Sequence, residues 1–311
     1  MKGRTADKTA FGLLLTVTTW VVVAPAQAQN RGVYPLGMSA TNSGVTPQPG
    51  VTYANQLIFY SRDHARDDAG NTLPVTGANY VLMDLNSLVW VSKKKILAGA
   101  NYSASATLPV AKNSLTSDVA GSVSGGAGFA DSYYLPVILG WRWERLALRA
   151  MYGFLAPTGR FEAGASDNVG SGYWTHTISS GQTFYLISNK RLILSAFQMY
   201  EFHTTQEGTD IHPGDTFNLD YSLMGALSMS QDVQLQMGVV GYEQRQTTAK
   251  TGPTISPAAS EERYAVNSFG LAVNSAFPKH RASVGLKYFK EFENRSTFQG
   301  YSLQLSGSIG L

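Results

Sequence analysis

The chain has 311 residues, no cysteine and a formal net charge of +3 at pH 7. Without cysteine it can form neither disulfide bonds nor thiolate metal sites. A charge balance this close to neutral gives no support for nucleic-acid binding, so we expect no nucleic-acid partner.

Residues 1–28 have the pattern of a signal peptide. Three basic residues in the first eight positions precede an apolar stretch over residues 11–23, and Ala26 and Ala28 supply the small-x-small cleavage pattern. The apolar stretch is shorter than the about 20 residues that a helix needs to cross a bilayer. We therefore predict export of the chain and cleavage after residue 28. The remaining chain has a net charge of +1, because residues 1–28 hold three basic residues and one acidic residue.

Residues 29–50 differ from the rest in being rich in Gly, Pro, Ser and Thr. Two interpretations of this segment remain open. It is either a flexible periplasmic leader or a plug that folds into the interior of the domain that follows.

Residues 51–311 read as a succession of strands with no convincing long helix. The last strand shows this best, because Tyr301, Leu303, Leu305 and Ile309 alternate with polar or small residues. Successive strand side chains point to opposite faces, so one face of this strand is apolar and the other polar. The twelve predicted strands cover residues 51–63, 79–90, 96–108, 130–141, 146–155, 173–188, 191–203, 215–228, 233–247, 263–277, 281–294 and 297–311.

The connections between these strands alternate in length. The long ones cover residues 64–78, 109–129, 156–172, 204–214 and 248–262. Short periplasmic turns and long outer loops are the layout of bacterial outer-membrane barrels. We therefore predict an all-β fold, a transmembrane antiparallel up-and-down β-barrel of about 12 strands that lies in the outer membrane of a Gram-negative bacterium. Its outer face would contact outer-membrane lipid, and the Gly-rich run over residues 121–128 would be a flexible outer loop.

The polar face of the predicted strands supplies the candidate lumen-lining residues. Both signs of charge occur among them, so no strong ion selectivity is predicted. They either line a path for a solute or pair with one another inside a filled barrel. The candidates are Asp84, Asn86, Arg149, Asn218, Asp220, Ser222, Gln234, Gln236, Asn274, Lys287, Glu291 and Gln304.

No catalytic or metal site is predicted. On the strand that carries His176, Ser179 is an odd number of residues away and faces the opposite side, while Ser180 is about 13 Å along an ideal strand. His203, Asp210, His212 and Asp215 surround one predicted outer loop, but a Pro-Gly step marks that stretch as an ordinary turn. We assign no catalytic residue, no metal and no cofactor, and we do not expect an enzyme.

Short motifs recur along the chain at residues 49–50, 128–131, 135–136, 139–141, 156–161, 172–175, 200–202, 213–215 and 238–246. In these segments the chain resembles a known family, the meta-pathway phenol-degradation family of outer-membrane β-barrel proteins. The order and spacing of the segments make the match specific.

The resemblance implies a barrel that passes hydrophobic aromatic compounds inward, and it implies no catalytic residue. The expected function is a porin-like outer-membrane channel or transporter for small, hydrophobic or aromatic compounds, which cross by passive diffusion. The alternatives are a structural or ligand-binding barrel with a filled lumen and, less favoured, a membrane-embedded hydrolase. The expected partners are the solute, the lipid and the barrel-insertion machinery.

The last residue departs from the usual signal for barrel insertion. That signal ends in Phe or Trp, whereas this chain ends in Leu311.

Overall fold

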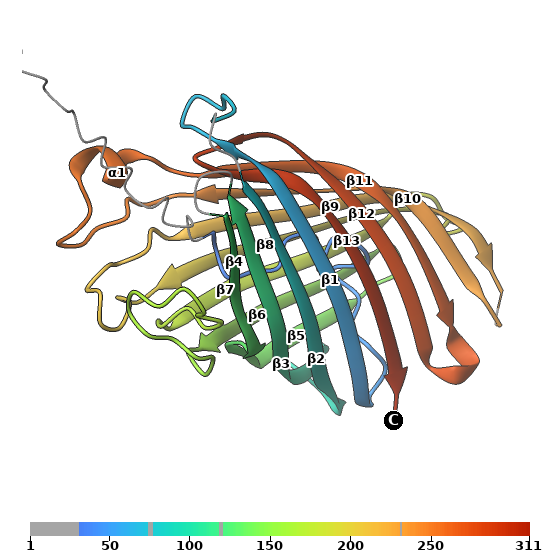
Figure 1. The fold of residues 1–311 in the computed structure, drawn as a ribbon. Coiled ribbons are helices and arrows are strands. Elements are labelled where there is room, and N and C mark those ends of the chain that lie inside the picture. Colours follow the sequence, from blue (N-terminus) through green and yellow to red (C-terminus); the bar gives the residue numbers. More distant parts are fainter. Residues whose placement is uncertain (1–30, 74–76, 118–120, 231) are drawn as a thin grey trace, which may run out of the picture.

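A computed structural model describes residues 31–73, 77–117, 121–230 and 232–311, so the predicted signal peptide lies outside the described residues. Strands dominate the fold (Figure 1). Besides them there is a short helix α1 (Pro257–Glu261) and a 3-10 turn η1 (Pro278–His280). In the part of the chain that the structure describes, no helix has the length and apolar character needed to cross a membrane. The strands are β1 (Gly50–Arg66), β2 (Gly77–Ile96), β3 (Ala100–Ser117), β4 (Gly121–Phe129), β5 (Ser132–Arg142), β6 (Leu146–Ala156), β7 (Thr175–Tyr185), β8 (Leu192–His203), β9 (Thr216–Met229), β10 (Gln234–Gln246), β11 (Ala265–Phe277), β12 (Ala282–Arg295) and β13 (Thr297–Gly310).

The strands form a closed antiparallel barrel. Each strand pairs with its neighbour in sequence, except that β5 pairs with β3 and not with β4. The ends of the wall meet where β1 pairs with β13, from Thr52 opposite Gly310 to Arg66 opposite Thr297. Twelve strands close the wall, and β4 is an addition to them. Closure leaves the terminal strand without a free edge. The predicted fold class of about 12 antiparallel strands is therefore confirmed.

The outer face of the barrel carries a band of exposed apolar side chains. Leu271 is 62% exposed, Leu305 53% and Leu286 47%. So large an apolar surface is unusual on a protein in water, whereas a bilayer requires it. The fold and this band place the protein in the outer membrane, as predicted.

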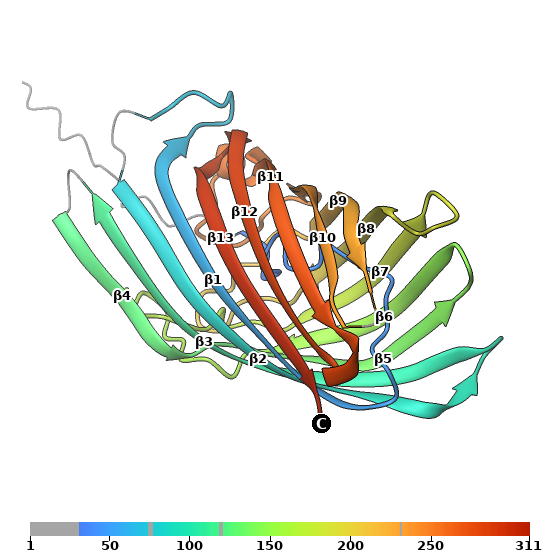
Figure 2. The same cartoon turned by 90° about the vertical axis from the view of Figure 1, so that its right-hand side faces the viewer.

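The Gly-rich run over residues 121–128 is not the flexible loop that the sequence predicted. It belongs to β4, which pairs with the outer half of β3, while β5 pairs with the periplasmic half. The break between β4 and β5 falls at Ala130 and Asp131. Because β6 ends at Ala156, β4 has β3 as its one strand neighbour among the described residues, and it lies at the margin of the barrel (Figure 2).

Strand β2 faces the opposite way from the prediction. Leu82, Leu88 and Trp90 are 40–54% exposed on the outer face, so Asp84 and Asn86 point outward with them and not into the lumen. The reason is that β2 carries apolar residues on both faces, so its alternation does not distinguish them.

The two misassigned residues form hydrogen bonds on the outer face. Asn55 Nδ2 donates to Asp84 Oδ1 at 2.5 Å, and Tyr53 Oη donates to Asn86 Oδ1 at 2.6 Å. These bonds satisfy polar atoms that lipid cannot.

Candidate functional site in the barrel lumen

Residues 31–49 are here called the N-terminal segment, which lies inside the barrel up to Thr46 and is exposed at residues 47–49 (Figure 2). Two buried carboxylates of the wall hold the segment. Glu201 on β8 accepts hydrogen bonds from the backbone nitrogens of Val33 at 2.9 Å and Tyr34 at 3.0 Å. An irregular backbone surrounded by a barrel wall needs such partners, because its own amides form no ladder.

Asp220 on β9 is the second carboxylate. It accepts hydrogen bonds from Tyr34 Oη at 2.6 Å and from the backbone nitrogens of Gly37 at 3.0 Å and Ser39 at 3.1 Å. Charge-assisted bonds of this kind are roughly twice as strong as neutral ones. Asp220 therefore anchors the N-terminal segment through three hydrogen bonds.

The opposite wall binds the carbonyl groups of the same segment. Lys287 Nζ donates to the carbonyl oxygens of Gly37 and Met38, both at 2.7 Å, and Gln304 Nε2 donates to that of Leu36 at 2.7 Å. Strands β8 and β9 thus bind the amides of the segment, and β12 and β13 bind its carbonyls.

The first described residue of the segment makes an ion pair. Arg31 Nη1 lies 2.8 Å from Glu291 Oε1, and Arg31 also donates to the backbone oxygen of Phe298. The side chains of both partners are almost fully buried. The pair joins the segment to β12 and β13.

Five of the predicted lumen residues therefore lie at these contacts or directly beside them. Asp220, Lys287, Glu291 and Gln304 bind the segment, and Asn218 donates to Glu201 Oε1 at 2.9 Å.

The other inward candidates lie elsewhere on the wall. Gln236 accepts a hydrogen bond from Asn42 at 3.1 Å, and Arg149 donates to the carbonyl oxygen of Ser43 at 2.7 Å. Ser222 is buried, and Gln234 and Asn274 occupy inward register positions on β10 and β11.

Sequence reasoning missed Glu201 and Tyr34 as site residues. Glu201 stands between Tyr200 and Phe202, and this alternation was the available signal for an inward carboxylate. Nothing in the local pattern around Tyr34 indicates its role, because its partner Asp220 is 186 residues away.

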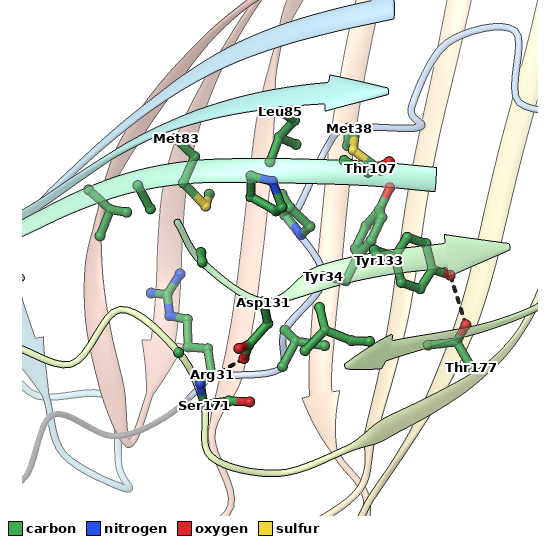
Figure 3. A pocket seen from close by; sticks show the side chains of 18 of the residues that line it. Arg31, Tyr34, Met38, Met83, Leu85, Thr107, Asp131, Tyr133, Ser171 and Thr177 are labelled. Atoms are coloured by element: carbon green, nitrogen blue, oxygen red, sulfur yellow. Dashed lines mark hydrogen bonds between the residues drawn. The ribbon is translucent and has the colours of Figure 1, made fainter. Parts of the chain in front are cut away.

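A cavity of ≈ 1240 Å³ occupies the rest of the lumen, on the side of β1 to β6 (Figure 3). It extends from the periplasmic ends of β12 and β13, at Ser283 and Ser308, to outer-loop residues such as Phe161 and Lys250. Its apolar wall combines strand residues with the N-terminal segment and consists of Tyr34, Met38, Val81, Met83, Leu85, Tyr133, Leu135, Ile138, Met151, Leu155, Phe197 and Met199.

Aromatic side chains and one carboxylate shape this cavity. Tyr34 stacks on Phe197 with ring centroids 5.3 Å apart, and Tyr133 Oη lies 2.8 Å from Thr177 Oγ1. Asp131, at the break between β4 and β5, accepts hydrogen bonds from the backbone nitrogens of Gly159 at 2.9 Å and Ser171 at 2.7 Å. Asp131 thus fixes the 157–174 loop where it borders the cavity.

The histidines have structural partners. His203 Nδ1 lies 2.8 Å from Thr175 Oγ1, and the backbone nitrogen of His203 donates to Asp215. His176 faces outward and lies 2.9 Å from Tyr152 Oη. Among the residues that the structure describes, no three His, Asp or Glu side chains are grouped so that they could hold a metal ion.

A closed antiparallel barrel with an apolar outer band and a polar interior defines the chain as an outer-membrane β-barrel protein. The chain belongs to the family described as "Putative MetA-pathway of phenol degradation", which it matches over residues 62–306. This confirms the family that the motifs indicated.

Solved structures share the fold. The chain is similar to the COG4313 outer membrane channel from Pseudomonas putida F1, with a TM-score of 0.70 and 12% identity over 86% of this chain and 97% of that one. It is also similar to the beta domain of the Bordetella autotransporter BrkA, with a TM-score of 0.52 and 11% identity over 85% of this chain and 100% of that one. No curated protein sequence matches the chain significantly.

Proposed function

We propose that the protein is an outer-membrane channel for small hydrophobic or aromatic compounds, which cross it by passive diffusion. The observation that carries this proposal is the cavity of ≈ 1240 Å³, whose lining extends from the outer loops to the periplasmic strand ends. Binding sites for small molecules are mostly apolar with a few polar groups, and this lining has that composition. A solute with a large apolar surface would be favoured there over a small, strongly hydrated ion.

The far edge of β4, beside which no strand lies in the described part of the chain, supports a second way out of the same cavity. Gly125 and Gly126 of β4 and Ala130 at the break line the cavity, and β4 has no strand on its far side among the described residues. A hydrophobic solute could leave the lumen here for the lipid, where its free energy is lower than in water. The axial and lateral routes share the entrance at the outer loops.

The proposal is tested by narrowing the cavity. Met83 on β2 lines the cavity, whereas its neighbour Leu82 faces lipid and is 40% exposed. We expect Met83→Trp to narrow the passage and to reduce uptake of benzyl alcohol into proteoliposomes about tenfold. A reduction of this size corresponds to a free-energy barrier for passage that is roughly 1.4 kcal/mol higher. Leu82→Trp adds the same bulk outside and should leave uptake unchanged.

The same measurement separates the channel from the filled-lumen alternative. That alternative is favoured by the N-terminal segment, which occupies the side of the lumen next to β8, β9, β12 and β13. If the unaltered protein binds benzyl alcohol but does not accelerate its uptake, the barrel is a ligand-binding protein and the channel proposal fails.

A further inference from the structure

Arg149 on β6 is a lumen cation that has no ion pair with any residue in the described part of the chain. Its Nε donates to the carbonyl oxygen of Ser43 at 2.7 Å. Its two Nη groups have neither a hydrogen bond nor an ion pair with any residue that the structure describes. The side chain is only partly buried and lines the cavity. Its free donors therefore remain available to a molecule in the cavity.

Two other cations inside the barrel are engaged differently. Arg31 is paired with Glu291 at 2.8 Å. Lys287 donates to two carbonyl oxygens at 2.7 Å and does not line the cavity. An anion that reaches Arg149 would find Nη donors without a partner among the described residues, whereas at Arg31 or Lys287 it would have to compete with the existing acceptors.

The surroundings of Arg149 hold its guanidinium in place. Its neighbours across the sheet are Gly140 on β5 and Gly181 on β7. A Cβ at Gly140 would overlap the side chain of Thr46, and one at Gly181 would overlap the carbonyl oxygen of Ser43. The N-terminal segment therefore lies against the wall on both sides of Arg149, where it directs Nε to Ser43.

A series of hydrogen bonds in the N-terminal segment links Arg149 to an apolar surface of the cavity. Ser43 Oγ donates to the carbonyl oxygen of Ser39 at 2.6 Å, and the Ser39 nitrogen donates to Tyr34 Oη at 2.9 Å. Tyr34 stacks on Phe197, and Met151 lies two residues beyond Arg149 on the same face of β6. Tyr34, Phe197 and Met151 all line the cavity with Arg149.

We propose that Arg149 and this apolar surface form a binding site for aromatic carboxylates. The planar guanidinium would receive the carboxylate through its Nη groups, since this fork geometry suits two parallel hydrogen bonds. The ring of the ligand would lie against the aromatic and methionine side chains. The inference rests on the proposed function and narrows its substrate class to hydrophobic anions.

The experiment compares two solutes of similar size, benzoate and benzyl alcohol. Binding of each to the purified barrel is measured by calorimetry, and uptake of each is measured in proteoliposomes. We expect Arg149→Met to weaken benzoate binding about tenfold or more, the effect of losing a charge-assisted pair, with little change for benzyl alcohol. Arg149→Lys should restore part of the benzoate affinity because it keeps the charge.

Two controls make the result specific. Arg145→Met removes the same charge from the exposed turn between β5 and β6 and should leave benzoate binding unchanged. Heat-dependent gel mobility checks that each variant is a folded barrel. A merely structural role of Arg149 in holding Ser43 would change both solutes equally, and that outcome overturns the proposal.

The test also separates this inference from the proposed function. If the barrel conducts benzyl alcohol but benzoate neither binds nor responds to Arg149→Met, the carboxylate site is refuted and the channel stands. If the barrel accelerates the uptake of neither solute, the channel fails. Benzoate binding that Arg149→Met abolishes would then still support the site.

Discussion

The two sides of the lumen differ in how their polar groups are used. On the side of β8, β9, β12 and β13, the polar side chains that bind the N-terminal segment are 0–3% exposed, as with Asp220, Lys287 and Gln304. On the side of β1 to β6, the wall is apolar at residues such as Met83 and Leu135 and encloses the cavity.

This difference shows that a polar lumen residue is not by itself evidence of a polar path. The charges on the filled side serve to satisfy the backbone of the N-terminal segment, which has no strand partner. The cavity beside them is lined largely by apolar side chains, together with Arg149 and a few other polar residues such as Gln56, Asp131 and Lys250. The composition of the path thus depends on the segment as much as on the barrel wall.

Asp220→Ala should have the largest effect on the difference between the two sides of the lumen. This substitution removes the acceptor for Tyr34 Oη and for the nitrogens of Gly37 and Ser39. Buried donors left without an acceptor cost about 1–3 kcal/mol each. We expect the segment to leave its position, and single-channel conductance in a planar bilayer to rise several-fold as the filled side opens.

The matched control for this prediction is Asp84→Ala, which removes an aspartate from the outer face. It should leave conductance as it is. An Asp220→Ala barrel with unaltered conductance would show that the segment stays in place without this carboxylate. The difference between the filled side and the cavity side would then not depend on Asp220.

A smaller effect is expected from Gly37→Ala. Gly37 has a φ of +81°, and a Cβ there would lie 2.6 Å from two ring carbons of Phe289. The left-handed backbone and the crowding together should cost about 1–3 kcal/mol. The thermal transition measured by heat-dependent gel mobility should fall.

Gly225→Ala provides the comparison for Gly37→Ala, because a Cβ at Gly225 would have its nearest neighbour, the Met237 oxygen, at 3.7 Å. We expect Gly225→Ala to leave the thermal transition nearly unchanged. Equal losses in both variants would mean that the space around Gly37 is not limiting.

The smallest effect is expected from Tyr60→Phe on β1. Tyr60 Oη donates to the carbonyl oxygen of Leu36 at 3.0 Å. Its loss should cost about 1 kcal/mol, the net value of one neutral hydrogen bond. Hydrogen exchange at residues 34–40 should become faster while conductance stays the same. A loss of stability as large as that of Asp220→Ala would place the main anchor on β1 instead of on β9.

The alternation of side chains along the strands and of lengths among the connections was enough to predict the barrel. The last strand, with Leu303 and Leu305 on one face and Gln304 on the other, shows why, because a strand with one apolar face must place that face against lipid or a core. The inward positions of Asp220, Lys287 and Glu291 follow from the same rule. These features depend on residues close together in the chain, so the sequence carries them in full.

The tertiary structure decided what local pattern leaves undetermined. Strand β2 is apolar on both faces, so only its pairing with β1 and β3 shows that Asp84 points outward and Met83 inward. The Gly-rich stretch of β4 becomes a strand because β3 offers it an edge.

The position of the N-terminal segment could not be predicted from the local sequence pattern either. Tyr34 is 167 residues from Glu201 and 186 from Asp220, and only the closed barrel brings those carboxylates together around it. The sequence by itself therefore determined a membrane barrel with a polar interior. Only the tertiary structure divided that interior into a filled side and a path, because the division depends on hydrogen bonds between residues far apart in the chain.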